Sequence, residues 1–137
     1  MITVRLKHAD FDAIVAHARA ALPNEACGLI AGNMVNDTKT IDKIYLLSNV
    51  DNSPEHFSID PKEQLAAVKD MRANGISPLG NFHSHPSTPA RPSDEDIRLS
   101  YDVKASYLIL SLAEEKPVLR AFGVTGGEVS TQALEIV

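Results

Sequence analysis

The chain is poor in cysteine and in positive charge, and both shortages exclude kinds of function. Cys27 is the only cysteine among 137 residues, so the chain can form neither an intrachain disulfide nor a thiolate-rich zinc site. A formal net charge of −5 argues against non-specific nucleic-acid binding, which requires a basic face. No apolar stretch approaches membrane-spanning length, and the N-terminal residues lack a signal-peptide pattern. We therefore expect a cytoplasmic protein that binds neither membrane nor nucleic acid.

The composition is that of an ordinary globular protein, with 44% hydrophobic and 23% charged residues. A chain of this length can bury about two-thirds of the surface that it exposes when unfolded. No internal repeat, low-complexity tract or linker divides it. We therefore expect one domain that spans residues 1–137. The sequence does not indicate an oligomeric state.

Apolar spacing and capping residues predict two long helices and a set of strands. Apolar residues recur at helical spacing over 8–21, and Pro23 lies just past the end of that stretch. Asp60 as a cap and Pro61 in the first turn predict a second helix over 61–73. A short helix is expected from Ser93. Strands are expected near 2–6, 27–32, 41–47, 76–82, 105–112, 118–124 and 129–133, with a brief extended piece at 56–59. The alternation of helices and strands predicts an α/β fold in which helices cover the faces of a sheet.

The segment His83-Ser84-His85-Pro86 and the nearby Asp96 form the most informative pattern in the chain. Residues two apart on a strand project from the same face, so the two imidazoles could converge on one ion while Ser84 points away. Two histidines and a carboxylate are typical of a catalytic zinc site, in which the fourth position is left for water. The pattern therefore predicts a hydrolytic metal site.

Each of these residues also has a purely structural interpretation. A single histidine on an apolar strand is more often a hydrogen-bonded core residue than a ligand. Ser93 and Asp96 stand at the spacing of a capping box that opens the short helix, so Asp96 could serve the helix rather than a metal. Because a carboxylate has two oxygens, Asp96 could do both. From spacing alone, the two interpretations of Asp96 are about equally supported.

A peptide hydrolase also needs a group that takes a proton from water and passes it to the leaving amine. The chain has no His-Glu-x-x-His motif, so this group must come from elsewhere in the sequence. Glu25 is the best candidate because it lies where a helix ends and an apolar, glycine-flanked strand begins. Taken alone, however, a glutamate at this position is more often a solvated loop residue. Cys27 is expected to be a small buried residue under the site rather than a ligand or nucleophile.

Taken together, these motifs resemble the JAMM, or MPN-plus, family of zinc peptidases and isopeptidases. The resemblance rests on Glu25 in Glu-Ala-Cys-Gly-Leu, on His83-Ser84-His85-Pro86, on Ser93 and Asp96, and on the stretch from Asn49 to Pro61, which is similar to compact bacterial members. It implies a mixed sheet flanked by helices, similar to that of cytidine deaminases. It also implies that His83, His85 and Asp96 bind one zinc ion with a catalytic water. Glu25 would be the general base and then acid, and Ser93 would hydrogen-bond the oxyanion or the water.

The resemblance implies a substrate as well, namely the C-terminus of ubiquitin or of a ubiquitin-like protein. Some compact bacterial members act on ubiquitin-like sulfur-carrier proteins that end in Gly-Gly, and the predicted partner is such a carrier or its C-terminal conjugate. Two alternatives remain open: a non-catalytic MPN-type interaction module, and a relative of the DNA-repair-associated His-x-His-Pro family. A zinc deaminase is excluded because its site needs two or three cysteines.

Overall fold

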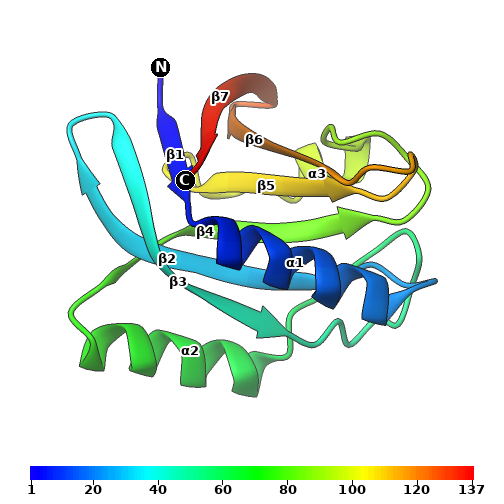
Figure 1. Cartoon of the computed structure of the whole chain (residues 1–137), viewed down its shortest axis with the longest axis horizontal. Helices are drawn as coiled ribbons and strands as arrows, with labels where there is room; N and C mark the ends of the chain where they lie inside the picture. The colour runs from blue at the N-terminus through cyan, green and yellow to red at the C-terminus, as the bar shows by residue number, and fades with distance from the viewer.

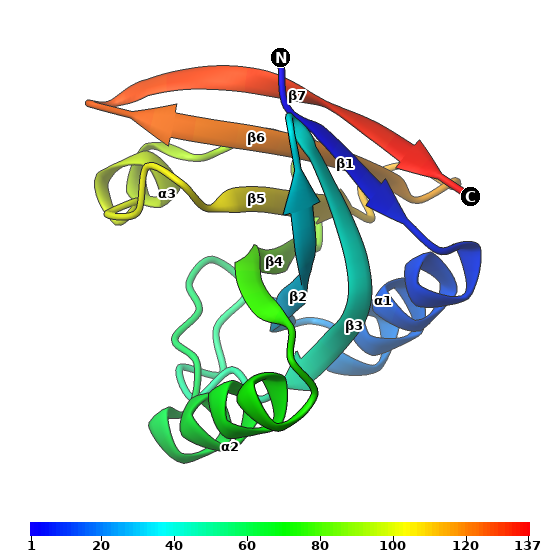
Figure 2. The same ribbon diagram turned by 90° about the vertical axis from the view of Figure 1, so that its left-hand side faces the viewer.

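The computed structural model describes residues 1–137, which form seven strands and three helices. The strands make one mixed sheet in the order β1-β3-β2-β4-β5-β6-β7, and β7 pairs back with β1 to close it (Figures 1 and 2). None of the helices is both long enough and apolar enough to cross a membrane. The elements are β1 (Thr3–Leu6), α1 (His8–Ala21), β2 (Cys27–Val35), β3 (Thr38–Leu47), α2 (Pro61–Ala73), β4 (Ser77–His85), α3 (Asp94–Arg98), β5 (Ser106–Ser111), β6 (Val118–Thr125) and β7 (Glu128–Ile136).

The two long helices confirm the predictions made from spacing and caps. α1 buries Ile14, Val15 and Ala18, which lie on the predicted apolar stripe. In α2, the Asp60 carboxylate accepts a hydrogen bond from the Lys62 amide at 2.8 Å, and Pro61 occupies the first turn. Both features stabilise the first turn, where backbone N–H groups have no partner within the helix. Local sequence therefore accounts for where these helices begin.

The predicted fold class, a mixed sheet flanked by helices, is also confirmed, but the closure of the sheet was not foreseen. β1 runs parallel to β3 and to β7, so the first and last strands of the chain lie side by side. β2 continues to Val35, three residues beyond the predicted strand. Residues 56–59 form no strand, and only an isolated bridge joins Asn49 to Ile59.

The two long helices cover opposite faces of the central strands, and this arrangement places the site. Phe82 of β4 lies in the main core with the apolar stripe of α1, whereas Ala67 and Met71 of α2 pack on the other side against Ala31. Side chains alternate along a strand. Asn81, His83 and His85 therefore share the β4 face opposite Phe82.

Gly28 lets β2 approach β4 closely beside the site. A Cβ at this position would lie 2.1 Å from the Tyr45 carbonyl oxygen and 2.2 Å from the Phe82 ring. Both distances are far inside van der Waals contact, so only glycine fits.

Candidate active site

The structure brings together the three predicted metal-ligand side chains. Nε2 of His83 and Nε2 of His85 lie 3.1 Å apart, and Oδ2 of Asp96 lies 3.1 and 3.2 Å from them. The two imidazoles come from adjacent same-face positions of β4, and the carboxylate comes from α3. The histidine side chains are only 3% and 5% exposed, and Asp96 is 17% exposed. We call these three residues the His-His-Asp trio.

The donor atoms of the trio fit a zinc ion. His85 Nδ1 donates to the Pro89 carbonyl oxygen at 2.9 Å, which leaves its Nε2 lone pair facing the other two ligand atoms. Neutral imidazole nitrogens and a carboxylate oxygen are ligands that zinc accepts, and three protein ligands leave one position open. Two facing Nε2 atoms and one carboxylate oxygen cannot satisfy one another fully by hydrogen bonds alone. The arrangement therefore suits a cation at their centre.

Electrostatics within the trio favour a charged carboxylate. Burial alone would raise the pKa of Asp96, but hydrogen bonds with His83, His85 and the Ser93 amide hold that pKa well below its usual range. Burial likewise opposes protonation of His85, yet its hydrogen bonds to Asp96 and the Pro89 carbonyl raise its pKa overall. The site thus stabilises negative charge on Asp96 and positive charge next to it, as a cation site requires.

The predicted capping box opens α3 and fixes Asp96. Ser93 Oγ accepts from the Asp96 amide at 3.0 Å, and Asp96 Oδ2 accepts from the Ser93 amide at 2.9 Å. Asp96 both caps α3 and faces the histidines, but it does so with one oxygen, since the Oδ2 that completes the cap is also the atom that faces both imidazoles. The Ser93 hydroxyl lies on the surface and keeps its hydrogen available for donation.

Glu25 is buried rather than solvated. Its side chain belongs to a residue only 5% exposed, and Oε1 has no hydrogen-bond partner. Burial raises its pKa to about 7; among charged neighbours His85 lowers it and Asp96 raises it. A carboxyl group that titrates near neutral pH is suited to accept and return a proton. The solvated-loop interpretation of Glu25 is therefore wrong.

Ser84, between the two histidines, ties the Glu25 segment to β4. Its Oγ accepts from the Ala26 amide at 2.8 Å, and its own amide donates to the Ala26 carbonyl at 3.0 Å. From the sequence we predicted that Ser84 points away from the ion, but we predicted no contact for its hydroxyl. The position of a serine on the core face of a strand, between two histidines, was the one sequence feature that indicated such a hydrogen bond.

The loop between β3 and α2 contributes a residue that the sequence did not single out. Phe57 stacks on the imidazole of His83, with ring centres 4.7 Å apart and an angle of 21° between planes. Nδ1 of His83 is buried and has no hydrogen-bond partner, unlike Nδ1 of His85. The stack therefore orients the His83 ring together with the contacts that its Nε2 makes with Asp96 and His85. In the sequence, the only indication of this stack was an aromatic residue within a loop of mostly polar residues.

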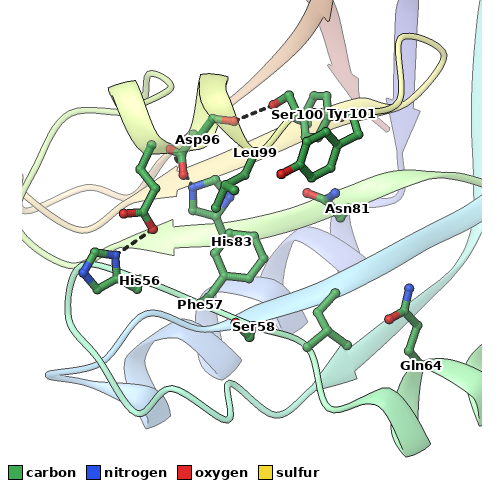
Figure 3. A pocket seen from close by; sticks show the side chains of 13 residues that line it. His56, Phe57, Ser58, Gln64, Asn81, His83, Asp96, Leu99, Ser100 and Tyr101 are labelled. Carbon is green, nitrogen blue, oxygen red and sulfur yellow. Dashed lines mark hydrogen bonds and ion pairs between the residues drawn. The ribbon is translucent and has the colours of Figure 1, made fainter.

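Asn49 holds this loop in place. Its side-chain amide donates to the carbonyl oxygens of Glu25 and His56, and its oxygen accepts from the amides of Asp51 and Ser58. An ion pair of 2.7 Å between His56 and Glu95 joins the loop to α3 (Figure 3). The loop is thus fastened on both sides of the trio.

Cys27 is fully buried, and burial raises the pKa of its thiol to about 12. It lies beside His83 in the register of β2 and β4. A thiol with such a pKa is neutral near pH 7 and is neither a good nucleophile nor a ligand. The packing role expected for Cys27 is confirmed.

A sequence family described as prokaryotic homologues of the JAB domain matches residues 7–123. The chain is 32% identical over 127 residues to a protein of Mycobacterium tuberculosis named CysO-cysteine peptidase, covering 92% of this chain and 86% of that one. It is 37% identical over 84 residues to a Thermus thermophilus protein named probable TtuB-protein conjugate cleaving protease, covering 61% of this chain and 53% of that one. A solution structure of a Desulfitobacterium hafniense protein is 52% identical, with a TM-score of 0.91, covering 98% of this chain and 92% of that one.

Proposed function

Because this chain belongs to the prokaryotic branch of the JAB family, also called JAMM or MPN-plus, and is a hydrolase, we propose a specific reaction for it. The proposed reaction is zinc-dependent hydrolysis of the amide bond at the C-terminal Gly-Gly of a ubiquitin-like sulfur-carrier protein. The observation that carries the proposal is the convergence of the His-His-Asp trio, and it is supported by the buried Glu25, whose pKa is about 7 and whose neighbour Ala26 hydrogen-bonds Ser84 between the two histidines. The peptidase names of the relatives argue against a non-catalytic interaction module.

His83, His85 and Asp96 would hold one zinc ion, whose contribution when bound is Lewis-acid activation of water and of the scissile carbonyl. Glu25 takes a proton from the attacking water and delivers it to the departing nitrogen. The carbon–nitrogen bond breaks, and the products are a carrier with a free Gly-Gly carboxylate and an amine. The pKa of about 7 lets Glu25 perform both transfers near neutral pH.

The Ser93 hydroxyl would donate a hydrogen bond to the oxygen that gains negative charge in the transition state. Its position at the start of α3 fixes it relative to Asp96, since each accepts a hydrogen bond from the other's backbone. Ser84 and Phe57 would act indirectly, by positioning other residues. Ser84 holds the chain next to Glu25, and Phe57 orients His83.

The substrate class is supported by what the relatives are named for. Proteins named CysO-cysteine peptidase, TtuB-protein conjugate cleaving protease and desampylase all match this chain at 32% identity or more over the matched residues. The first two names describe cleavage of a bond between a protein, CysO or TtuB, and the group that is attached to it. A sulfur carrier with a C-terminal cysteine is the smallest substrate of this kind.

The test is incubation of the zinc-loaded protein with a sulfur-carrier protein joined through Gly-Gly to cysteine, followed by mass spectrometry of the carrier. We expect loss of one cysteine residue and a free Gly-Gly terminus. Glu25→Gln should keep one bound zinc and lose hydrolysis, whereas Asp96→Asn should lose zinc affinity. Hydrolysis by Glu25→Gln at the unaltered rate would remove Glu25 from the mechanism, and an intact conjugate would refute the proposed substrate.

A further inference from the structure

A cavity of about 410 Å³ opens beside the trio and extends along the outer face of β4 (Figure 3). His83 and Asp96 lie at one end of it. Its walls come from the loop before α2, from α2 itself, and from the segment that follows α3. Its lining also includes Ile59, Gln64, Asn81, Leu99 and Tyr101.

Asn81 and His83 both line this cavity and both have a buried polar atom without a hydrogen-bond partner, and of the two only Asn81 lies outside the trio. Its Oδ1 is buried and accepts no hydrogen bond, which is unfavourable for a polar group. Rotation about its last side-chain bond can present either the oxygen or the NH₂ group to the cavity. In Figure 3, the Gln64 side chain reaches from α2 toward Asn81. Two side-chain amides therefore line the same cavity.

The spacing of Asn81 matches an extended peptide that ends at the trio. Asn81 lies two positions before His83 on the same face of β4, which is about 7 Å along the strand. An extended peptide has the same repeat. If its scissile carbonyl lies at the trio, the backbone of the residue that precedes Gly-Gly lies beside Asn81.

The position of Glu25 determines which half of the substrate enters this cavity. Glu25 does not line it and instead borders a smaller hollow of about 210 Å³ with Asn24 and Asn52. In the proposed function, Glu25 delivers a proton to the leaving nitrogen, so the leaving group departs on the Glu25 side. The acyl half of the substrate must then extend the other way, into the larger cavity.

The walls define the side chain that suits the residue before Gly-Gly. Leu99 and Tyr101 are 49% and 83% exposed and form an apolar wall together with Ile59. Glu95 is already paired with His56, and Asp96 faces two imidazoles, so neither carboxylate is left free to attract a basic side chain. An apolar side chain fits this wall.

We propose that this cavity is the groove for the acyl-side tail of the substrate, in which the Asn81 and Gln64 amides bind the tail backbone and the Leu99–Tyr101 wall contacts the residue before Gly-Gly. This inference rests on the proposed function for the direction of the tail. It makes Asn81 a specificity-determining residue for the backbone, and Tyr101 one for the side chain.

A binding experiment tests the groove without requiring turnover. The probe is the product-like peptide Ala-Leu-Arg-Leu-Gly-Gly with a free carboxylate, titrated into the ¹⁵N-labelled, zinc-loaded protein. We expect the largest shifts at the side-chain NH₂ signals of Asn81 and Gln64. Shifts confined to Asn24 and Asn52, or no shifts at all, would overturn the groove whether or not the protein cleaves any conjugate.

A cleavage experiment tests the contact itself, using the same peptide joined to cysteine. Asn81→Ala should raise KM by about three- to tenfold, the value of one hydrogen bond, with a smaller change in kcat. Methylation of the peptide nitrogen of the residue before Gly-Gly should impose a similar loss on the unaltered enzyme and little further loss on Asn81→Ala. Asn33→Ala, which removes an exposed amide on β2, is the matched control and should leave KM unchanged.

Additive losses from Asn81→Ala and from N-methylation would overturn the contact while leaving the proposed function standing. A peptide that binds with the expected shifts but is never cleaved would refute the proposed function and leave the groove standing. The two failures are thus distinguishable.

Discussion

Replacement of Glu25 by Gln should make the metal-free protein more stable, and the gain should grow with pH. Burial raises the pKa of Glu25 from its ordinary value of 4.5 to about 7. Between these values the folded protein binds more protons at this group than the unfolded chain does, so the free energy of unfolding falls as pH rises. A shift of about 2.5 units corresponds to about 3 kcal/mol once the pH exceeds 7. Gln has nearly the same shape but no charge, and it removes this penalty.

The assay is urea unfolding of both proteins after chelator treatment, at pH 5 and at pH 8. At pH 5 the two free energies of unfolding should differ by about 1 kcal/mol or less, because Glu25 is protonated in the folded protein. At pH 8 the Gln variant should be more stable by about 3 kcal/mol, because Glu25 is then charged in a buried position. Other titrating groups are common to both proteins and cancel. The same difference at both pH values would show that Glu25 is not held in a desolvated position.

Three further predictions concern the metal and the cap. Phe57→Leu should lower zinc affinity by about tenfold or more in chelator competition, since second contacts of ligand histidines have effects of this size; retained affinity would show that the stack does not orient His83. Zinc affinity should fall between pH 8 and pH 6, because zinc must displace a proton from His85, whose pKa is raised; equal affinities would contradict that shift. Ser93→Ala should cost about 1 kcal/mol of stability as a lost cap and slow turnover by about a hundredfold with zinc retained; a change in stability alone would limit Ser93 to capping.

The helices could be predicted from the sequence because their signals are local. Helix 61–73 is specified by Asp60, Pro61 and the Asn74-Gly75 stop within a single stretch, and the structure places α2 at Pro61–Ala73. Closure of the sheet could not be predicted in this way, because it depends on residues far apart in the sequence. β1 pairs with β7 across almost the whole chain, and no spacing within either strand encodes that partner. Non-local pairing therefore had to come from the structure.

The same division applies to the site. His83 and His85 could be predicted to converge because strand period is a local property, and the capping box at Ser93 and Asp96 was also legible. Burial of Glu25 could not be read from its neighbours, since it depends on where the loop from Asn49 lies. The contacts of Ser84, Phe57 and Asn81 are tertiary in the same sense, and only packed coordinates bring them together.

The two hydrogen bonds between Ala26 and Ser84 have a consequence for enzyme that has lost its ion. Ser84 lies between His83 and His85 in the chain, and it also holds Ala26, the residue next to Glu25. Removal of a metal ion would therefore leave the hydrogen bonds between Ala26 and Ser84 intact, because neither residue is a predicted ligand. We therefore expect the metal-free protein to keep these segments in place, so that a metal ion can rebind without refolding of the chain.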